Sequence, residues 1–590
     1  MINLKLFWRH PSDSITVGFI ILYFYSISAW NPDPHHDGIQ FTSGAAAANG
    51  KIAHLDFFEQ YGPLNAYFHG AALYVFGDYL LVLRFLTVGI LAFISILMLH
   101  LMRVHDLGAT SRSLLVILWA LSCPVTSVTD NIYGLYPWPS LTTQLFSLAC
   151  IVILIKIRSS KPTPISKLDL LFLSLLSVGI FFTRIQVGFL TIAVILFVLG
   201  NLEVDTKNRY QIRKAFLKYL AFLFIPILFF GLTSRSFLPF MDQIIIAPFD
   251  LYSNPMNWDL LEGYLKVGIP LAVILALTSI VFFFCTSRRK SFLIYIGLVL
   301  TYLGIQMNPG QNQFTTQVLL RELGVGPNSN YQANFMALSY LSASLILAIL
   351  VLEKMGFSKR QVFFPKIRAV SKKLLKRSKA STSMEVRMPT VSNFGMISLM
   401  SIPSLALLYP LPSSYHVWWS SPVVVIMFAI GLRVIAPKNR FREIVFLPLF
   451  LPTLVVLLLS WNSATQRNWI TLENGAMKNM KVESQYSQSY YRMDEFLNIE
   501  KTESISAICF DGMFVSWDGD FNSNGPKVVS WGFGLRNSAE PKPADRMFLC
   551  SDDEFARNFA STNKVIITRE LEYKFSWWSK GKIFEYEPIP

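Results

Sequence analysis

The stretch SITVGFIILYFYSISAWNPDPHHDGI, residues 14–39, places an apolar run directly before two carboxylates and two imidazoles. The run from Thr16 to Trp30 is long enough to span most of a bilayer, and Asn31 and Pro32 end it. Carboxylates at the end of a membrane helix are costly unless they face water or take part in chemistry. This placement predicts a membrane protein with a chemical site at the mouth of its first helix.

The composition of the whole chain agrees with that prediction. Of the 590 residues, 53% are hydrophobic and only 15% are charged, whereas a soluble protein has roughly a quarter charged residues. The first apolar run is interpreted as a retained anchor and not as a cleaved signal peptide. Hydropathy predicts about thirteen apolar helices, near residues 14–31, 81–102, 111–127, 138–156, 168–183, 185–201, 215–233, 265–285, 291–307, 333–352, 394–410, 420–436 and 443–460.

The net charge of +15 is distributed as a membrane topology would require. Lysine and arginine cluster in every second connection between the expected helices, most densely from Lys354 to Arg387. Basic loops stay cytoplasmic, so we expect a multi-pass protein of the plasma (inner) membrane with its N-terminus inside. The lipid bilayer is then the partner that explains the charge, and no nucleic acid is expected.

The last part of the chain has a different character. Residues 461–590 contain short β-like runs and two helical patterns, which predict a small extracytoplasmic α/β domain after a multi-span domain over residues 1–460. The predicted fold class is therefore a polytopic α-helical membrane protein with a small C-terminal α/β domain. Cys509 and Cys550 lie in this outer domain, where oxidation can occur, and the sequence leaves their pairing open.

Asp37 and Asp33 are the candidate chemical groups of the first outer loop, residues 31–80. A carboxylate at a membrane boundary can act as a general base toward a hydroxyl or an amine. The acids and their neighbouring imidazoles could also bind a divalent ion or contact a phosphate. The structural alternative is that both acids cap the helix expected from Ile39 to Asn49, and spacing alone does not decide between these readings.

The remainder of the loop resembles the GT-C superfamily of integral-membrane glycosyltransferases. Within it, the resemblance is to the branch of the dolichyl-phosphate-mannose protein mannosyltransferases and the lipid A aminoarabinose transferase. Asp37-Gly38 matches the position of the acid motif, Gly50 matches the end of the following helix, and the run from Tyr61 to Leu64 (Tyr-Gly-Pro-Leu) matches the final element. The match is close only over residues 1–100, and Gly38 departs from it because many relatives carry Glu there.

The resemblance implies an inverting transfer of a sugar from a polyprenyl-phosphate carrier to a glycan, lipid or protein acceptor at the outer face. Asp37 would be the general base and Asp33 its helper, without a firm metal site. The missing acid at Gly38 leaves open whether a divalent cation, Mg or Mn, takes part. Two outer arginines, Arg184 and Arg321, are candidates for gripping the carrier phosphate, although Arg184 could instead be a snorkelling interfacial residue.

Weaker candidates for substrate contacts come from the same outer segments. Asp130 occupies a loop where relatives carry another functional acid, Lys51 and His54 could face the phosphate, and Tyr61 belongs to the matched motif. Helix capping and plain solvation are the alternatives for these residues. Several outer aromatic residues could stack on a sugar or belong to an interfacial belt, namely Tyr136, Trp138, Trp418 and Trp419. A transporter or flippase of a lipid-linked saccharide is the alternative function, although such proteins place charged sites near the bilayer midplane.

Overall fold

The computed structural model describes most of the first 244 residues and separate parts of the remainder. The described residues are 10–33, 36–57, 59, 61–123, 134–159, 165–202, 209–241, 244, 391–408, 414–435, 464–473, 475–497, 505–508, 546–551, 553–575 and 580–588.

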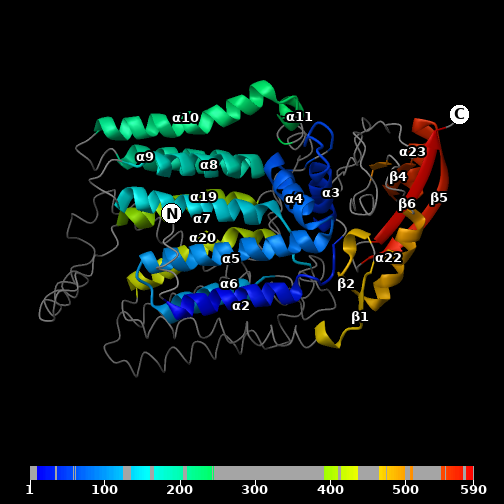
Figure 1. Cartoon of the computed structure of the whole chain (residues 1–590), viewed down its shortest axis with the longest axis horizontal. Helices are drawn as coiled ribbons and strands as arrows, with labels where there is room; N and C mark the ends of the chain where they lie inside the picture. The colour runs from blue at the N-terminus through cyan, green and yellow to red at the C-terminus, as the bar shows by residue number, and fades with distance from the viewer. Residues whose placement is uncertain are drawn as a thin grey trace, which may run out of the picture.

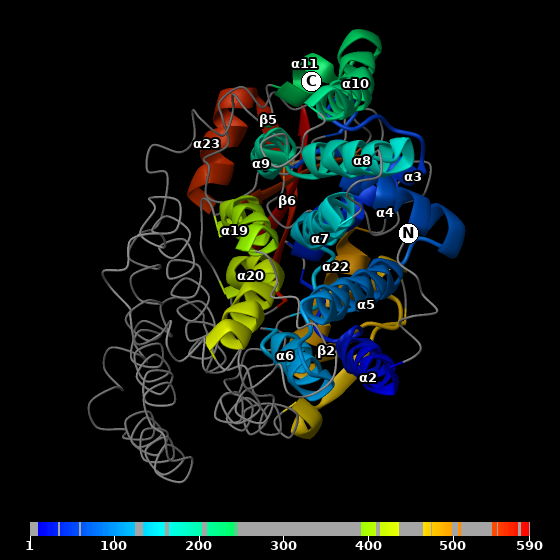
Figure 2. The same cartoon turned by 90° about the vertical axis from the view of Figure 1, so that its left-hand side faces the viewer.

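Long helices running side by side make up the larger part of the described chain (Figure 1). In chain order they are α2 (Pro11–Ile27), α5 (Leu80–Val104), α6 (Ala109–Leu121), α7 (Pro139–Ser159), α8 (Lys167–Thr183), α9 (Ile185–Leu202), α10 (Arg209–Thr233), α19 (Val391–Leu405) and α20 (Ser414–Ile435). Three stretches within them, Leu80–Val104, Pro139–Arg158 and Lys214–Thr233, are long and apolar enough to cross a membrane. Figure 2, which looks along the bundle, shows α5 and α7 inside it and α10 at its margin.

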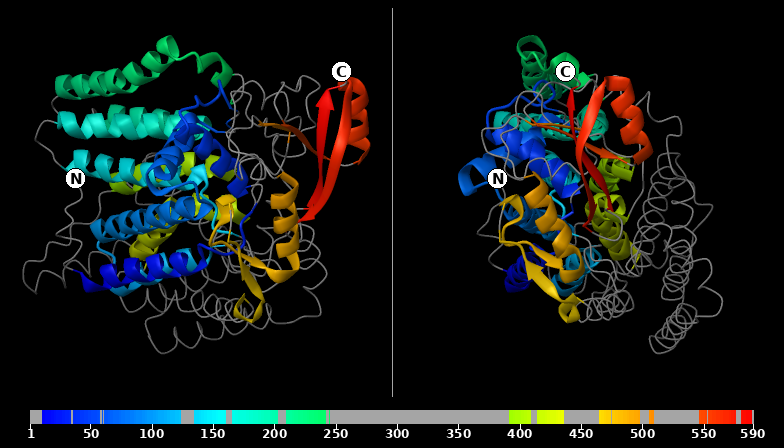
Figure 3. Two further views of the ribbon diagram at one scale, coloured as in Figure 1. Left: turned by 45° about the vertical axis from the view of Figure 1, so that its right-hand side comes forward. Right: turned by 90° about the vertical axis from the view of Figure 1, so that its right-hand side faces the viewer.

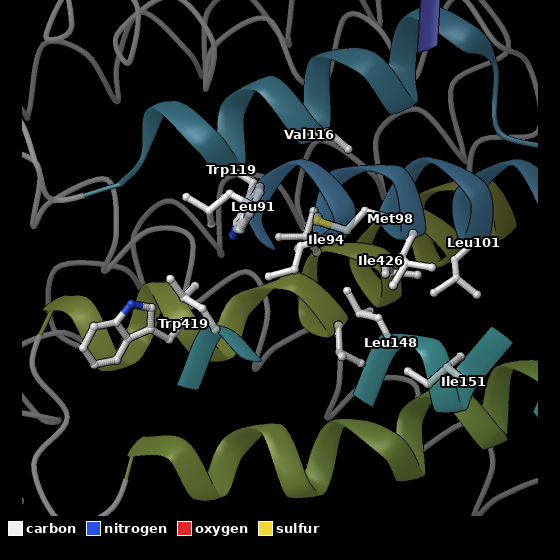
Figure 4. Close-up of a cluster of buried hydrophobic side chains, with 14 of the residues drawn as sticks. Leu91, Ile94, Met98, Leu101, Val116, Trp119, Leu148, Ile151, Trp419 and Ile426 are labelled. Carbon is white, nitrogen blue, oxygen red and sulfur yellow. The ribbon is translucent and has the colours of Figure 1, made fainter. Parts of the chain in front are cut away.

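The interior of this bundle is apolar. Leu91, Ile94 and Met98 of α5 meet Leu148 of α7 and Ile426 of α20, all almost fully buried (Figure 4). By contrast, α10 leaves large apolar side chains exposed, among them Leu217, Phe229 and Leu232. An apolar helix surface of this kind is stable when it faces lipid.

Two shorter helices, α3 (His36–Ala48) and α4 (Pro63–Phe76), lie at one end of the bundle, which we call the outer end. They pack unusually closely, because a Cβ added at Gly70 would lie 2.9 Å from the Cβ of Ala47. Every residue of α3 from Asp37 to Ala46 is buried, whereas α4 exposes its last residues, from Tyr74 to Phe76. Thus α4 alone of the two presents an apolar surface to the surroundings.

The C-terminal part adds a small α/β unit at the same end (Figure 3). A two-stranded antiparallel sheet joins β1 (Trp469–Thr471) and β2 (Lys481–Glu483), and α22 (Ser484–Leu497) follows it. A four-stranded sheet has the order β3-β4-β6-β5, built from β3 (Ile505–Ile508), β4 (Arg546–Ser551), β5 (Val565–Lys574) and β6 (Lys580–Pro588). In it β3 and β4 are parallel and the other pairs antiparallel, and α23 (Asp553–Asn563) packs against β4 and β5.

This unit contacts the bundle through a shared apolar core. Phe41 of α3 and Leu83 of α5 belong to the same buried cluster as Met477, Met480 and Tyr490 of the C-terminal part. The C-terminal residues therefore cover the first outer loop directly.

The remaining short elements are α11 (Phe237–Met241), η3 (Ala406–Leu408) and η4 (Gly475–Met477).

The predicted helices and the observed ones agree where both exist. Each apolar helix expected within the described residues coincides with an observed helix, and the chain is a mostly helical protein with a small sheet domain. The expected helices near 265–285, 291–307, 333–352 and 443–460 lie outside the described residues. The total of about thirteen, the topology and the two domain boundaries therefore stay predictions.

Candidate active site at the outer end of the bundle

Asp37 is completely buried at the start of α3 and forms an ion pair with Arg84 of α5. The Arg84 Nε donates to Asp37 Oδ1 at 3.0 Å, and its Nη2 donates to Oδ2. The backbone N–H of Asp33 donates a further hydrogen bond of 2.7 Å to Oδ2. Two parallel bonds from a guanidinium fix both the position and the orientation of a carboxylate.

Arg84 also holds the chain that leads from the first helix to Asp37. Its Nη1 donates to the carbonyls of Ser28 and Trp30 at 3.2 and 3.1 Å, and its Nη2 donates to that of Asn31 at 3.4 Å. Gly134 packs directly against this arrangement and leaves no room for a side chain. A Cβ at this position would collide with Arg84 Nη2 and lie 2.7 Å from the Asn31 carbonyl. Arg84 is thus fully buried, its charge is paired with Asp37, and its nitrogens donate to that carboxylate and to backbone carbonyls.

Sequence reasoning missed Arg84, although a signal for it exists. It is the one charged residue between Leu80 and His100, in a helix of high hydropathy. A cation in that position needs a buried partner, and a carboxylate of the first outer loop is the expected one.

Asp33 forms a second polar group with His36. Its Oδ1 accepts a hydrogen bond from the backbone N–H of His36 at 2.9 Å, and its Oδ2 lies 2.9 Å from His36 Nδ1. The Tyr136 hydroxyl also hydrogen-bonds Asp33, and the His36 ring stacks on that of Tyr136 with centroids 4.6 Å apart. Asp33 is 4% exposed and the His36 side chain 21% exposed, so the imidazole is the more accessible partner.

Tyr61 and Arg184, which are distant in sequence, come together beside this group. The Arg184 guanidinium lies 4.9 Å from the centre of the Tyr61 ring, and its Nη1 donates to Ser140 Oγ at 2.6 Å. The glycine after Tyr61 makes the approach possible, since a Cβ at Gly62 would overlap the carbonyl of Phe182. Arg184 is only 3% exposed. It is therefore a buried cation at the outer end and not a snorkelling surface residue.

Trp138 connects the two groups. Its ring lies 5.1 Å from that of His36 and 5.4 Å from that of Tyr61. We call Asp33, His36, Asp37, Tyr61, Tyr136, Trp138 and Arg184 the outer cluster. Trp419 of α20 stacks on Trp138 at 5.6 Å with an interplanar angle of 14°. Because Trp419 covers one face of the Trp138 ring, Trp138 forms part of the wall of the outer cluster.

His416 of α20 also lies near the outer cluster. Its ring meets that of Trp419 at 5.1 Å, and it lies within electrostatic range of both Arg184 and His36. His416 thus has a guanidinium and a second imidazole as neighbours. Such nitrogen donors are suited to binding an anion.

Other predicted site residues lie elsewhere. Lys51 and His54 follow the far end of α3, where His54 packs edge-on against Phe240 of α11 with ring centroids 5.1 Å apart. The backbone N–H of Lys51 donates to the carbonyl of Ala46 at 3.1 Å, so Lys51 lies near the end of α3 opposite to Asp37. Asp130 and Arg321 lie outside the described residues.

Burial alters the acid–base properties of the outer cluster. Desolvation raises the pKa of the Asp37 carboxyl, while the charge and hydrogen bonds of Arg84 act in the opposite direction. Burial, with the nearby Asp33 carboxylate, raises the pKa of Tyr136 well above its ordinary value, so its hydroxyl stays protonated. The cluster therefore combines two carboxylates, a neutral donor and buried arginines.

The described residues contain no group of three or more His, Cys, Asp or Glu side chains that could hold a metal ion. Asp33 and His36 offer one carboxylate and one imidazole nitrogen, which is fewer than the three protein ligands of a typical catalytic zinc site. These two residues alone do not make a zinc site, whereas Mg²⁺ is commonly held by one or two carboxylates together with substrate phosphates, so Mg or Mn stays an expectation.

Comparison with known proteins gives structural matches only. No family model matches the chain, and no curated protein matches it. One similar solved structure is the archaeal oligosaccharyltransferase AglB from Archaeoglobus fulgidus in complex with an inhibitory peptide and a dolichol-phosphate, with a TM-score of 0.44 and 11% identity. Another is the Archaeoglobus fulgidus oligosaccharyltransferase in complex with Zn and sulfate, with a TM-score of 0.43 and 11% identity.

The two matches cover 88% and 87% of this chain but 65% and 62% of the matched chains. The chain thus spans less than two thirds of the length of either structure. Both matched proteins are oligosaccharyltransferases. A likeness of this size does not establish an activity or a substrate.

Proposed function

We propose that the protein is a membrane glycosyltransferase that moves a sugar from a polyprenyl-phosphate carrier to an acceptor at the outer face. The observation that carries the proposal is the outer cluster itself, in which buried carboxylates and a buried arginine are brought together by the loop of GT-C-like sequence. Such a transfer needs a base for the acceptor and cations for the departing phosphate. The cluster contains both.

Asp37 is assigned the role of general base. A carboxylate oxygen can accept two hydrogen bonds, and Asp37 Oδ1 accepts one, from Arg84 Nε at 3.0 Å. Its remaining lone pair can take the proton of an acceptor hydroxyl as that oxygen attacks the anomeric carbon. The carrier phosphate leaves from the opposite face of the sugar, so the anomeric configuration is inverted.

Arg184 is assigned to the carrier phosphate. It is held by Ser140 and by the Tyr61 ring, so its orientation is set before substrate binds. A preoriented guanidinium stabilises the negative charge that develops on a leaving phosphate without having to reorganise. His416 lies within electrostatic range of Arg184 and His36, and both imidazoles can add hydrogen bonds to the phosphate oxygens.

Transfer by the purified full-length protein in proteoliposomes tests this assignment. The donor is a labelled polyprenyl-phosphate sugar, and the acceptor is an extract of the native membrane or surface glycan. We expect Asp37→Asn to reduce transfer by a factor of about 10³, consistent with the loss of a general base. Asp56→Asn is the matched control, because Asp56 lies in the same loop and caps the backbone of Ile52.

The alternative function makes a different prediction for the same vesicles. A transporter or flippase of a lipid-linked saccharide would move the labelled lipid between leaflets without cleaving its sugar–phosphate bond. Leaflet exchange without release of free polyprenyl phosphate would refute the proposed transfer. If Asp37→Asn transfers sugar as fast as Asp56→Asn, the protein would still be a glycosyltransferase, but Asp37 would not be its general base.

A further inference from the structure

The C-terminal part of the chain binds the backbone just before the outer cluster. The N–H of Asn31 donates to the carbonyl of Lys481 at 2.8 Å, and the N–H of Lys481 donates to the carbonyl of Ala29 at 2.7 Å. These bonds make Trp30 the bridge partner of Lys481, in parallel orientation. Residues 29–31 are therefore joined to β2 by an isolated β-bridge.

Side chains reinforce this attachment. The Trp30 ring stacks on Trp469 of β1, with centroids 5.7 Å apart and an interplanar angle of 19°. From α22, the Tyr490 hydroxyl donates to the carbonyl of Pro32 at 3.2 Å. Tyr490 is fully buried, and its ring meets that of Phe575 edge-on at 4.6 Å.

The segment is thus held from two directions. Arg84 of the bundle binds the carbonyls of Ser28, Trp30 and Asn31, while β2 and α22 bind its other groups. The residue that follows Pro32 is Asp33, whose N–H binds Asp37 Oδ2. The Asp33 and Asp37 carboxylates therefore stay in place only while the segment of residues 28–32 keeps its own position.

We infer that the C-terminal α/β unit is a positioning device for the catalytic acids, and that Tyr490 is a positioning residue for Asp33 and Asp37. This inference rests on the proposed function, since it concerns the geometry of the same base. It predicts that a change in the C-terminal part, remote from the reacting atoms, slows transfer without weakening donor binding.

The test compares Tyr490→Phe with Tyr491→Phe in the full-length protein. The first change removes only the hydroxyl that binds Pro32, and the second removes that of a neighbouring tyrosine that is 46% exposed. Rates are normalised to folded protein, measured by size-exclusion chromatography and thermal unfolding. We expect kcat to fall about fivefold in Tyr490→Phe, as expected for a lost hydrogen bond of ordinary strength, with an unchanged KM for the donor.

A pH profile separates positioning from a general loss of stability. The charge of Asp33 raises the pKa of Asp37 and its N–H bond lowers it, so a change in the position of Asp33 should move the acidic limb of kcat/KM in Tyr490→Phe. The groups that face Asp37 are Arg84 from α5, Asp33 from its own loop and Tyr136 from the segment before α7. None of these is changed by the substitution.

Hydrogen exchange tests the attachment independently of any activity. Faster exchange of residues 29–37 in Tyr490→Phe than in Tyr491→Phe supports the inference, and equal exchange overturns it. Equal normalised kcat values and equal pH profiles for the two variants also overturn it. If the wild-type protein transfers no sugar, the proposed function fails while the exchange comparison still decides whether the C-terminal part holds the loop.

Discussion

Removal of the Arg84 guanidinium should destabilise the protein strongly. Arg84→Met leaves the Asp37 carboxylate in a fully buried position without its counter-ion and removes the donors to the Ser28 and Trp30 carbonyls. Breaking a buried ion pair by removing one partner costs about 3–5 kcal/mol. The double variant Arg84→Met/Asp37→Asn should recover about 2 kcal/mol of this loss, because no unpaired charge then remains buried.

The assay is unfolding of the purified protein in mixed detergent–SDS micelles, followed by tryptophan fluorescence. Lys156→Met is the control, since Lys156 pairs with Asp169 at 2.7 Å but is 49% exposed. An exposed pair contributes at most about 1 kcal/mol. A loss in Arg84→Met no larger than in Lys156→Met, or strict additivity in the double variant, would show that the buried pair does not hold the outer loop.

Three further predictions concern stability and covalent structure. Burial lowers the pKa of His69 from 6.5 to about 4. Between these pH values the folded protein binds fewer protons than the unfolded chain, so acidification through this window should lower the free energy of unfolding by about 3 kcal/mol. The unfolding curves of His69→Gln should lack this effect. Gly134→Ala should destabilise by about 1–3 kcal/mol by forcing Arg84 from its place, and a melting temperature equal to that of wild type would contradict this. Cys550 is disulfide-bonded, and Cys509, the other cysteine of the outer domain, is the expected partner, which non-reducing peptide mass spectrometry can detect as a linked pair.

Much of the bundle could be predicted from the sequence. Helices such as α5 and α8 coincide closely with the expected ranges, because long apolar runs have few alternatives in a bilayer. The short helix α3 was also predicted, as the helix expected from Ile39 to Asn49. Its burial was not, because α3 is covered by residues of the C-terminal part more than 400 positions away in sequence.

Arg112 illustrates the same limit. In the sequence it lies near the start of the apolar helix expected at 111–127. In the structure its Nε donates to Asp13 Oδ1 at 2.7 Å, and Asp13 is fully buried. The residue therefore ties α6 to α2, and its role depends on a partner 99 positions away.

The sequence by itself determined the membrane character of the chain and pointed to the first outer loop. These follow from hydropathy and from the high cost of charge beside lipid, which depend only on local composition. Only the tertiary structure decided which groups hold Asp37, Asp33 and the segment before them. Arg84, Tyr136 and Tyr490 come from three different segments, and ion pairs and hydrogen bonds between distant segments depend on packing that no local pattern records.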